Sequence, residues 1–253
     1  MRRSSWIDEY YETFELLFWE PQHIGKQKNP DSRLRRPADV LARARRVEVT
    51  LNQQLSMMLS LLPERWVDGL LEFLTGRKPE SPVALNSPET RKLRAVYGNV
   101  TQPDIASFGE GEVLAVEMKV DARCDLDQVR KYLLLAALEG AEVPADTRFG
   151  LGFLGPRDCR SFFREGFADV EEVRAAVLSR PIPDSLGNMA TAPHADGIRE
   201  IAGRCSLQYR SYAELDAQLD GRCVALDAGD PGAETLLRLV GGFRGELRAR
   251  GLA

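Results

Sequence analysis

The chain has 253 residues, of which 43% are hydrophobic and 28% are charged, and its formal net charge is −4. This length and composition exclude a disordered tail and predict a globular protein with a sizeable core. No apolar run approaches the roughly 18 residues that a membrane span requires, and the N-terminal residues lack the apolar segment of a secretory signal, so we expect a cytoplasmic protein with no membrane partner.

The chain offers few residues for nucleophilic or zinc chemistry. It has two histidines, His23 and His194, and neither lies in a strand-turn-helix context that would expose a nucleophile. The four cysteines stand far apart without a CxxC pair, which argues against a zinc site or a disulfide framework. No phosphate-binding motif of the GxGxxG or GxxxxGK[ST] type occurs in the sequence. Any catalytic chemistry therefore has to rely on other residue types.

The N-terminal part changes from acidic and aromatic to basic. Residues 6–20 place aromatic and leucine side chains at near-helical spacing, which indicates a helix docked on its own core. Residues 24–46 carry eight basic residues against two aspartates, and this stretch has two interpretations, a solvated arm or a surface that follows phosphates. In the second interpretation, Arg43, Arg45 and Arg46 are candidates for contacts with nucleic acid.

Hydrophobic periodicity predicts that helices and strands alternate along the rest of the chain. The expected elements are helices at 37–62, 66–74, 126–138, 169–179, 194–203, 211–219 and 234–248, and strands at 97–107, 112–120, 148–154 and 206–210. This order indicates an α/β protein with a central mixed β-sheet, helices on both faces of the sheet, and helical N- and C-terminal additions. The expected organisation is an N-terminal extension of residues 1–37, a core of residues 38–222, and a C-terminal helical tail of residues 223–253 that packs on the core.

The stretch TQPDIASFGEGEVLAVEMK, residues 101–119, reads as a β-hairpin with unusual charges. Because side chains alternate along a strand, Glu117 and Lys119 share one face, and pairing across the turn brings Asp104 near Glu117. Two carboxylates with a backbone carbonyl nearby form an all-oxygen site suited to Mg²⁺ or Mn²⁺. A lysine beside such a metal orients an attacking water and offsets charge that develops on a phosphoryl group. The plainer alternative is an ion pair on a solvated strand face.

These residues resemble the signature of a known nuclease superfamily. Asp104 after Pro103, followed by Glu117-Met118-Lys119 on the next strand, is similar to the PD-(D/E)XK motif of the restriction-endonuclease-like fold. The resemblance implies that Asp104 and Glu117 ligate the metal, and that the carbonyl of Met118 adds a third oxygen. It also implies that Lys119 positions or activates the water.

A second motif follows on the next predicted helix. Gln128 and Tyr132 resemble the QxxxY motif of the RecB-like branch of this superfamily, and helical spacing places the two side chains on one face. The resemblance implies that they orient the lysine or the backbone phosphate. Arg130 and Lys131, which lie between them, are candidates for contacts with DNA phosphates.

The resemblance also implies a third acid and a function. An acidic residue on the first core helix often completes the metal site in this superfamily, and Glu48 is the candidate here, with Asn52 or Glu64 as alternatives. The implied function is a Mg²⁺-dependent nuclease that acts on DNA in restriction, phage defence or DNA repair. Two alternatives remain open, the same chemistry on RNA and a catalytically silent protein of this fold that binds nucleic acid or a partner protein. The sequence leaves open whether the protein forms a homodimer.

Overall fold

The chain divides into two compact units, which are Leu59–Tyr212 and a discontinuous unit made of Met1–Met58 and Ala213–Ala253. The computed structural model describes residues 5–7, 10–11, 48–80, 100–101, 103–109, 111–140, 148–227, 229 and 232–253. None of the helices within these ranges has the length and apolar character needed to cross a membrane.

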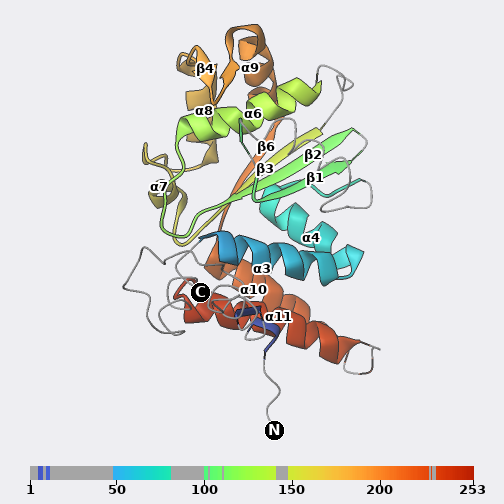
Figure 1. Ribbon diagram of the computed structural model, residues 1–253. Coiled ribbons are helices and arrows are strands. Elements are labelled where there is room, and N and C mark those ends of the chain that lie inside the picture. The colour runs from blue at the N-terminus through green and yellow to red at the C-terminus, as the bar shows by residue number, and fades with distance from the viewer. Residues whose placement is uncertain are drawn as a thin grey trace, which may run out of the picture. The chain divides into compact units, whose positions relative to one another are not determined.

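A mixed four-stranded sheet lies at the centre of the unit Leu59–Tyr212, in the order β1-β2-β3-β6 (Figure 1). Strand β1 (Ile105–Gly109) pairs antiparallel with β2 (Glu112–Met118). Strand β3 (Arg148–Gly155) lies parallel to β2 and to β6 (Ser206–Ser211). The predicted α/β class with a mixed sheet is therefore confirmed.

Helices cover both faces of this sheet. Helix α4 (Glu64–Thr75) packs on β2, β3 and β6 from one side. The opposite face packs against a layer of three helices, which are α6 (Leu126–Gly140), α8 (Val170–Ser179) and α9 (Ala195–Arg204). Figure 1 shows α4 and α6 on opposite sides of the strands. Because helices lie on both sides, side chains of both parities along β2 and β3 are buried.

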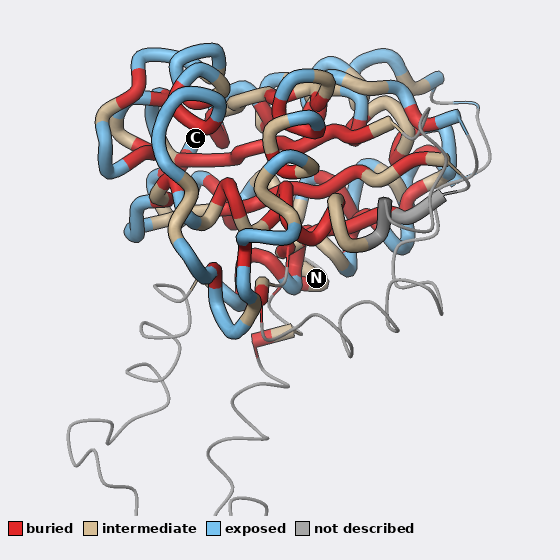
Figure 2. Tube along the Cα trace, turned by 90° about the horizontal axis from the view of Figure 1, so that it is seen from above, coloured by how far each residue is buried: buried red, intermediate tan, exposed pale blue. Residues whose placement is uncertain are grey.

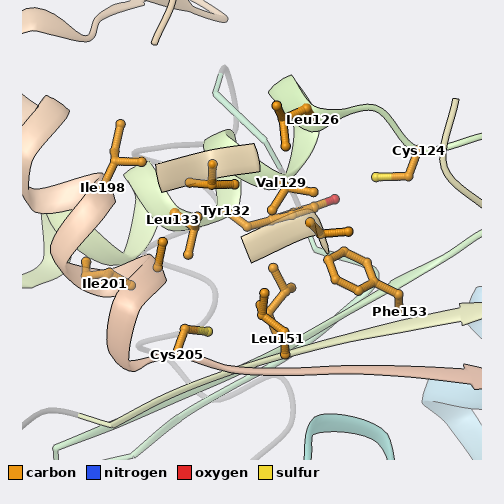
Figure 3. Packing of buried hydrophobic residues seen from close by; sticks show 14 of the residues in the cluster. Cys124, Leu126, Val129, Tyr132, Leu133, Leu151, Phe153, Ile198, Ile201 and Cys205 are labelled. Atoms are coloured by element: carbon orange, nitrogen blue, oxygen red, sulfur yellow. The ribbon is translucent and has the colours of Figure 1, made fainter. Parts of the chain in front are cut away.

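The sequence of β3, RFGLGFLG, explains how the two layers pack on one strand. Phe149, Leu151 and Phe153 belong to the core on the side of α6. The alternating glycines face α4, and a Cβ atom added to Gly152 would overlap the backbone carbonyl of Leu74. Figure 3 shows the apolar layer between α6, α9 and β3, and in Figure 2 the buried stretches of the trace are red. The glycines therefore allow α4 to approach the sheet, while the large residues fill the other side.

Most predicted elements agree with the structure. The apolar stripe of the first long helix is buried, and its described part is α3 (Glu48–Leu61). Helix α4 ends, as expected, at Gly76 in the left-handed conformation. Among the described residues, the elements that were not predicted are short, and they are α7 (Cys159–Phe162), β4 (Ser185–Leu186), β5 (Met189–Ala190) and η1 (Ala192–His194). Such short elements carry no periodic signal.

Two predicted boundaries differ from the described structure. The first strand was expected from residue 97. Residues 97–99 and 102 lie outside the described residues, Val100 and Thr101 are not in a strand, and the described strand begins at Ile105, after Pro103, which has no N–H to donate to a ladder. The helix expected at 211–219 is longer and forms α10 (Tyr212–Val224). Residues 12–47, 81–99 and 141–147 lie outside the described residues, and they include the basic stretch 24–46 and most of the predicted helix 6–20.

In the discontinuous unit, described residues near the N-terminus pack on α11 (Ala233–Ala249). The indole Nε1 of Trp6 donates to the carbonyl of Leu239 at 2.7 Å. Gly242 lies against this indole, since an added Cβ would come within 2.5 Å of Trp6 Nε1 and 2.9 Å of Ser5 Oγ. Of the two glycines in the middle of α11, Gly242 is therefore needed, because a larger residue would overlap the indole of Trp6.

A buried ion pair lies at the C-terminal end of α11, where Tyr11 also packs. Arg250 Nε donates to Glu246 Oε1 at 2.8 Å, and both side chains are almost fully buried. The Tyr11 hydroxyl donates to the same carboxylate oxygen at 2.5 Å, and Arg250 also donates to Thr50 Oγ1 at 2.9 Å. These hydrogen bonds compensate the two buried charges, which would otherwise destabilise the unit.

The glycine pair gives a matched test of this packing. We expect Gly241→Ala to raise the free energy of unfolding by about 0.5–1 kcal/mol, because alanine favours a helix and, outside the backbone of α11 itself, no atom of the described residues lies within 4 Å of the new Cβ. We expect Gly242→Ala to be less stable than Gly241→Ala by about 1 kcal/mol or more, because its Cβ displaces the indole. Urea unfolding of both variants measures the difference, and equal stabilities would contradict the close packing of Trp6.

Candidate functional site

Asp104 lies immediately before β1 and is hydrogen-bonded to the end of β2. Ile105 pairs with Val116 in the sheet, so one further residue along this register places Asp104 level with Glu117. The Oδ2 atom of Asp104 accepts a hydrogen bond from the N–H of Met118 at 2.7 Å. The side chain thus holds the start of β1 against the end of β2. The register and this contact with the residue after Glu117 agree with the prediction that Asp104 lies near Glu117.

The carboxylate of Glu117 is the centre of the site. Its residue is 2% exposed and lies on the sheet face that α6 covers. Its Oε1 atom is 2.5 Å from Lys119 Nζ and accepts from Gln128 Nε2 at 3.0 Å. Its Oε2 atom accepts a short hydrogen bond from the hydroxyl of Tyr132. The charge is therefore buried, with an ammonium group and two neutral donors directed at it.

Capping at the start of α6 fixes the position of these donors. The Oδ1 atom of Asp125 accepts from the backbone N–H of Gln128 at 2.9 Å, as an N-cap side chain does. The Oε1 atom of Glu165 accepts from the N–H of Leu126 at 3.0 Å. One turn apart on the helix, Gln128 Nε2 and the hydroxyl of Tyr132 lie 3.0 Å from each other. The expectation that Gln128 and Tyr132 point together is confirmed, although their donors point at Glu117 and not at the lysine.

Two neighbouring groups stay protonated because of this environment. Burial raises the pKa of Tyr132 well above its usual value, and the charge and the hydrogen bond of Glu117 raise it further. Burial, followed by the charge of Glu117, also raises the pKa of the Cys124 thiol. Figure 3 shows Tyr132 and Cys124 among the apolar side chains of this layer. Tyr132 is therefore a neutral donor, and Cys124 is not suited to act as a thiolate nucleophile.

Arg130 does not present its charge as predicted. It is 4% exposed, and its guanidinium donates to Asp127 Oδ1 at 2.9 Å and to the carbonyls of Arg180 and Pro181 at 3.2 and 2.8 Å. It lies on the opposite side of the helix from the two motif residues because it is two positions from each of them. These contacts tie α6 to the end of α8, which corrects the expectation of a phosphate contact. Lys131 is half-buried.

The outcome for the remaining candidates differs from residue to residue. Glu48 begins the described part of α3, in the discontinuous unit, and its role as a third acid stays a prediction. Of its alternatives, Asn52 is buried in the same helix and Glu64 is exposed in the first turn of α4. Arg43, Arg45 and Arg46 lie outside the described residues.

The donors near Glu117 fit Mg²⁺ in their chemistry. The carboxylates of Asp104 and Glu117 and the carbonyl of Met118 are hard oxygen ligands, and no imidazole or thiolate is needed. Within the described ranges, no group of three or more His, Cys, Asp or Glu residues could hold a metal ion. A metal here would therefore depend on two carboxylates, with backbone oxygen, water or substrate as further ligands.

Sequence reasoning missed the groups that support the motif residues. Asp125 could have been found, because an aspartate directly before an amphipathic pattern is a typical N-cap. Glu165 lies 39 residues from its partner Leu126, and no local pattern connects them.

Comparisons with known proteins identify no relative. No family model matches the chain, and no curated protein or solved structure matches it.

The raised pKa of Tyr132 predicts how stability depends on pH. At about pH 7–9 we expect Tyr132→Phe to lower the free energy of unfolding by about 1–3 kcal/mol, because a charged buried acceptor loses a donor. The folded-state pKa is above the unfolded value, so the contribution of Tyr132 is complete below about pH 10 and decreases as the pH rises further.

The measurement is urea unfolding of the wild type and of Tyr132→Phe between about pH 7 and pH 11. The difference between the two proteins should shrink by up to about 1.4 kcal/mol per pH unit above pH 10. Other tyrosines and the thiols titrate in both proteins, so their contributions cancel. A difference that stays constant to about pH 11 would contradict the burial of this hydroxyl against Glu117.

Proposed function

We propose that this protein is a metal-dependent nuclease of the PD-(D/E)XK superfamily, which hydrolyses phosphodiester bonds of DNA with Mg²⁺ as cofactor and Mn²⁺ as a substitute. One observation carries the proposal: the network around the Glu117 carboxylate brings together Lys119 of the signature motif and Gln128 and Tyr132 of the second motif. Asp104 lies beside this network, because it accepts a hydrogen bond from the N–H of Met118, the residue after Glu117. Residues that merely match a sequence pattern by chance have no reason to converge in this way.

In this proposal, Asp104 and Glu117 hold the metal together with the backbone carbonyl of Met118. A bound Mg²⁺ supplies Lewis acidity toward a phosphoryl oxygen and lowers the pKa of its water. The ammonium of Lys119, adjacent to Glu117, offers positive charge for the phosphoryl oxygens as they gain negative charge in the transition state. None of these roles needs a histidine.

Gln128 and Tyr132 act in the proposal as positioning residues for Glu117. Both donate to its carboxylate, one to each oxygen, and they leave its net charge unchanged. A carboxylate held from two sides keeps one orientation, which is what a metal with strict octahedral geometry requires. This role replaces the expectation that the pair orients the lysine or the phosphate.

The choice of DNA and the biological setting rest on the sequence resemblance. A role in restriction, phage defence or DNA repair belongs to this part of the proposal. RNA as substrate, and a catalytically silent protein that binds nucleic acid or a partner protein, are outcomes that the test below distinguishes.

The test is an assay of strand cleavage with plasmid, linear duplex and single-stranded DNA, and with RNA, in Mg²⁺, Mn²⁺ or EDTA. We expect metal-dependent cleavage of DNA by the wild type. Asp104→Asn and Lys119→Met should each lower the rate at least about 100-fold, because one removes a ligand charge and the other a stabilising charge. Asparagine keeps an oxygen that can accept from Met118, so it separates metal binding from the strand contact.

Asp184→Asn is the matched control, because Asp184 is exposed in the loop before β4 and has no part in the network. It should cleave at the wild-type rate. Cleavage that persists in EDTA, or in both site variants, would contradict the proposal. Binding of nucleic acid without any metal-dependent cleavage would favour the catalytically silent protein.

A further inference from the structure

The ion pair between Lys119 and Glu117 occupies the carboxylate that the proposed function assigns to the metal. The Nζ and Oε1 atoms are 2.5 Å apart, and the two side chains are 12% and 3% exposed. A carboxylate this deeply buried is strongly destabilising without a positive partner. Lys119 provides that partner in the metal-free protein.

A divalent cation at Glu117 would compete with this ammonium. Two cations that share one carboxylate repel each other, and the repulsion is large at a few ångströms in a site shielded from water. The neutral donors on Glu117 do not oppose a cation in this way, because Gln128 and Tyr132 carry no charge. Of these three described partners of Glu117, Lys119 is therefore the one that metal binding must move.

We infer that Lys119 is the counter-ion of Glu117 in the metal-free protein, and that a divalent metal takes its place at Oε1. This inference rests on the proposed function and concerns the regulation of the same site. It makes the order of events definite: the ammonium becomes available to a phosphoryl oxygen only when the metal has bound. In the metal-free protein, the ammonium of Lys119 stays on Glu117.

Gln128 and Tyr132 have a distinct part in this exchange. They hold the carboxylate through one donor on each oxygen, so that Glu117 stays oriented while its positive partner changes. The capping of α6 by Asp125 keeps Gln128 in place during the exchange. The contact of Glu117 with Lys119 is thus the one that exchanges, whereas its contacts with Gln128 and Tyr132 stay in place.

The inference predicts an unusual effect of removing the lysine. Lys119→Met keeps the length of the side chain but removes its charge, so Mn²⁺ should bind about tenfold or more tightly than to the wild type, as the competing cation is gone. Lys119→Arg keeps the charge and should bind Mn²⁺ within about threefold of the wild type. Isothermal titration of chelator-treated protein with Mn²⁺ measures both affinities.

Thermal unfolding of the same proteins is a second readout. Without metal, Lys119→Met should melt below the wild type, because Glu117 has lost its counter-ion. Saturating Mn²⁺ should then raise the melting temperature of Lys119→Met by more than it raises that of the wild type, since tighter binding to the folded state gives a larger shift. If Lys119→Met is unfolded without metal, recovery of the folded state in Mn²⁺ is the supporting result, and failure to recover it overturns the inference.

The outcomes separate this inference from the proposed function. If the wild type binds Mn²⁺ in a manner that Asp104→Asn abolishes, but Lys119→Met binds no more tightly, then the inference fails and the metal site stands. If Lys119→Met alone binds Mn²⁺ measurably, the inference is supported. If neither protein binds Mn²⁺ up to millimolar concentrations, both the inference and the metal-dependent function fail.

Discussion

The arrangement of the site depends on how one buried negative charge is compensated. Glu117 is held between the sheet and α6, where water is not available to solvate it. Its neighbours supply one ammonium, from Lys119 directly after β2, and two neutral donors, from Gln128 and Tyr132 on α6. A buried carboxylate satisfied in this way keeps its charge and its orientation together. The constraint works in both directions, since the same donors would be left without their acceptor if the glutamate were absent.

The sheet creates this constraint through the sequence of β3. Its alternating glycines let α4 approach one face closely, and its large residues pack under α6 on the other face. A sheet covered on both sides leaves no solvated face for the charges of β2. Glu117 must therefore find its partners inside the protein, and the side chains of Gln128 and Tyr132 reach it from α6.

Sequence patterns predicted the elements well and the environment of the site poorly. Long periodic segments such as α4, α6 and α11 were predicted within a few residues, and helical spacing correctly joined Gln128 to Tyr132. The burial of Glu117 and the internal contacts of Arg130 were not predictable, because they depend on which helix covers which face. The support from Glu165 was equally hidden, since it comes from a distant loop. Spacing along the chain identifies which residues can belong to a site, but tertiary packing determines which acceptor each donor binds.

The discontinuous unit affects the order in which the protein folds during translation. Trp6 and Tyr11 find their partners Leu239 and Glu246 more than 200 residues later in the chain. The unit Leu59–Tyr212 is contiguous and is complete well before the last helix emerges. Domains generally fold as they are synthesised, from the N-terminus onward. Trp6 and Tyr11 must therefore wait until more than 200 further residues have been translated, and a nascent chain that stalls before α11 would expose these aromatic side chains to chaperones.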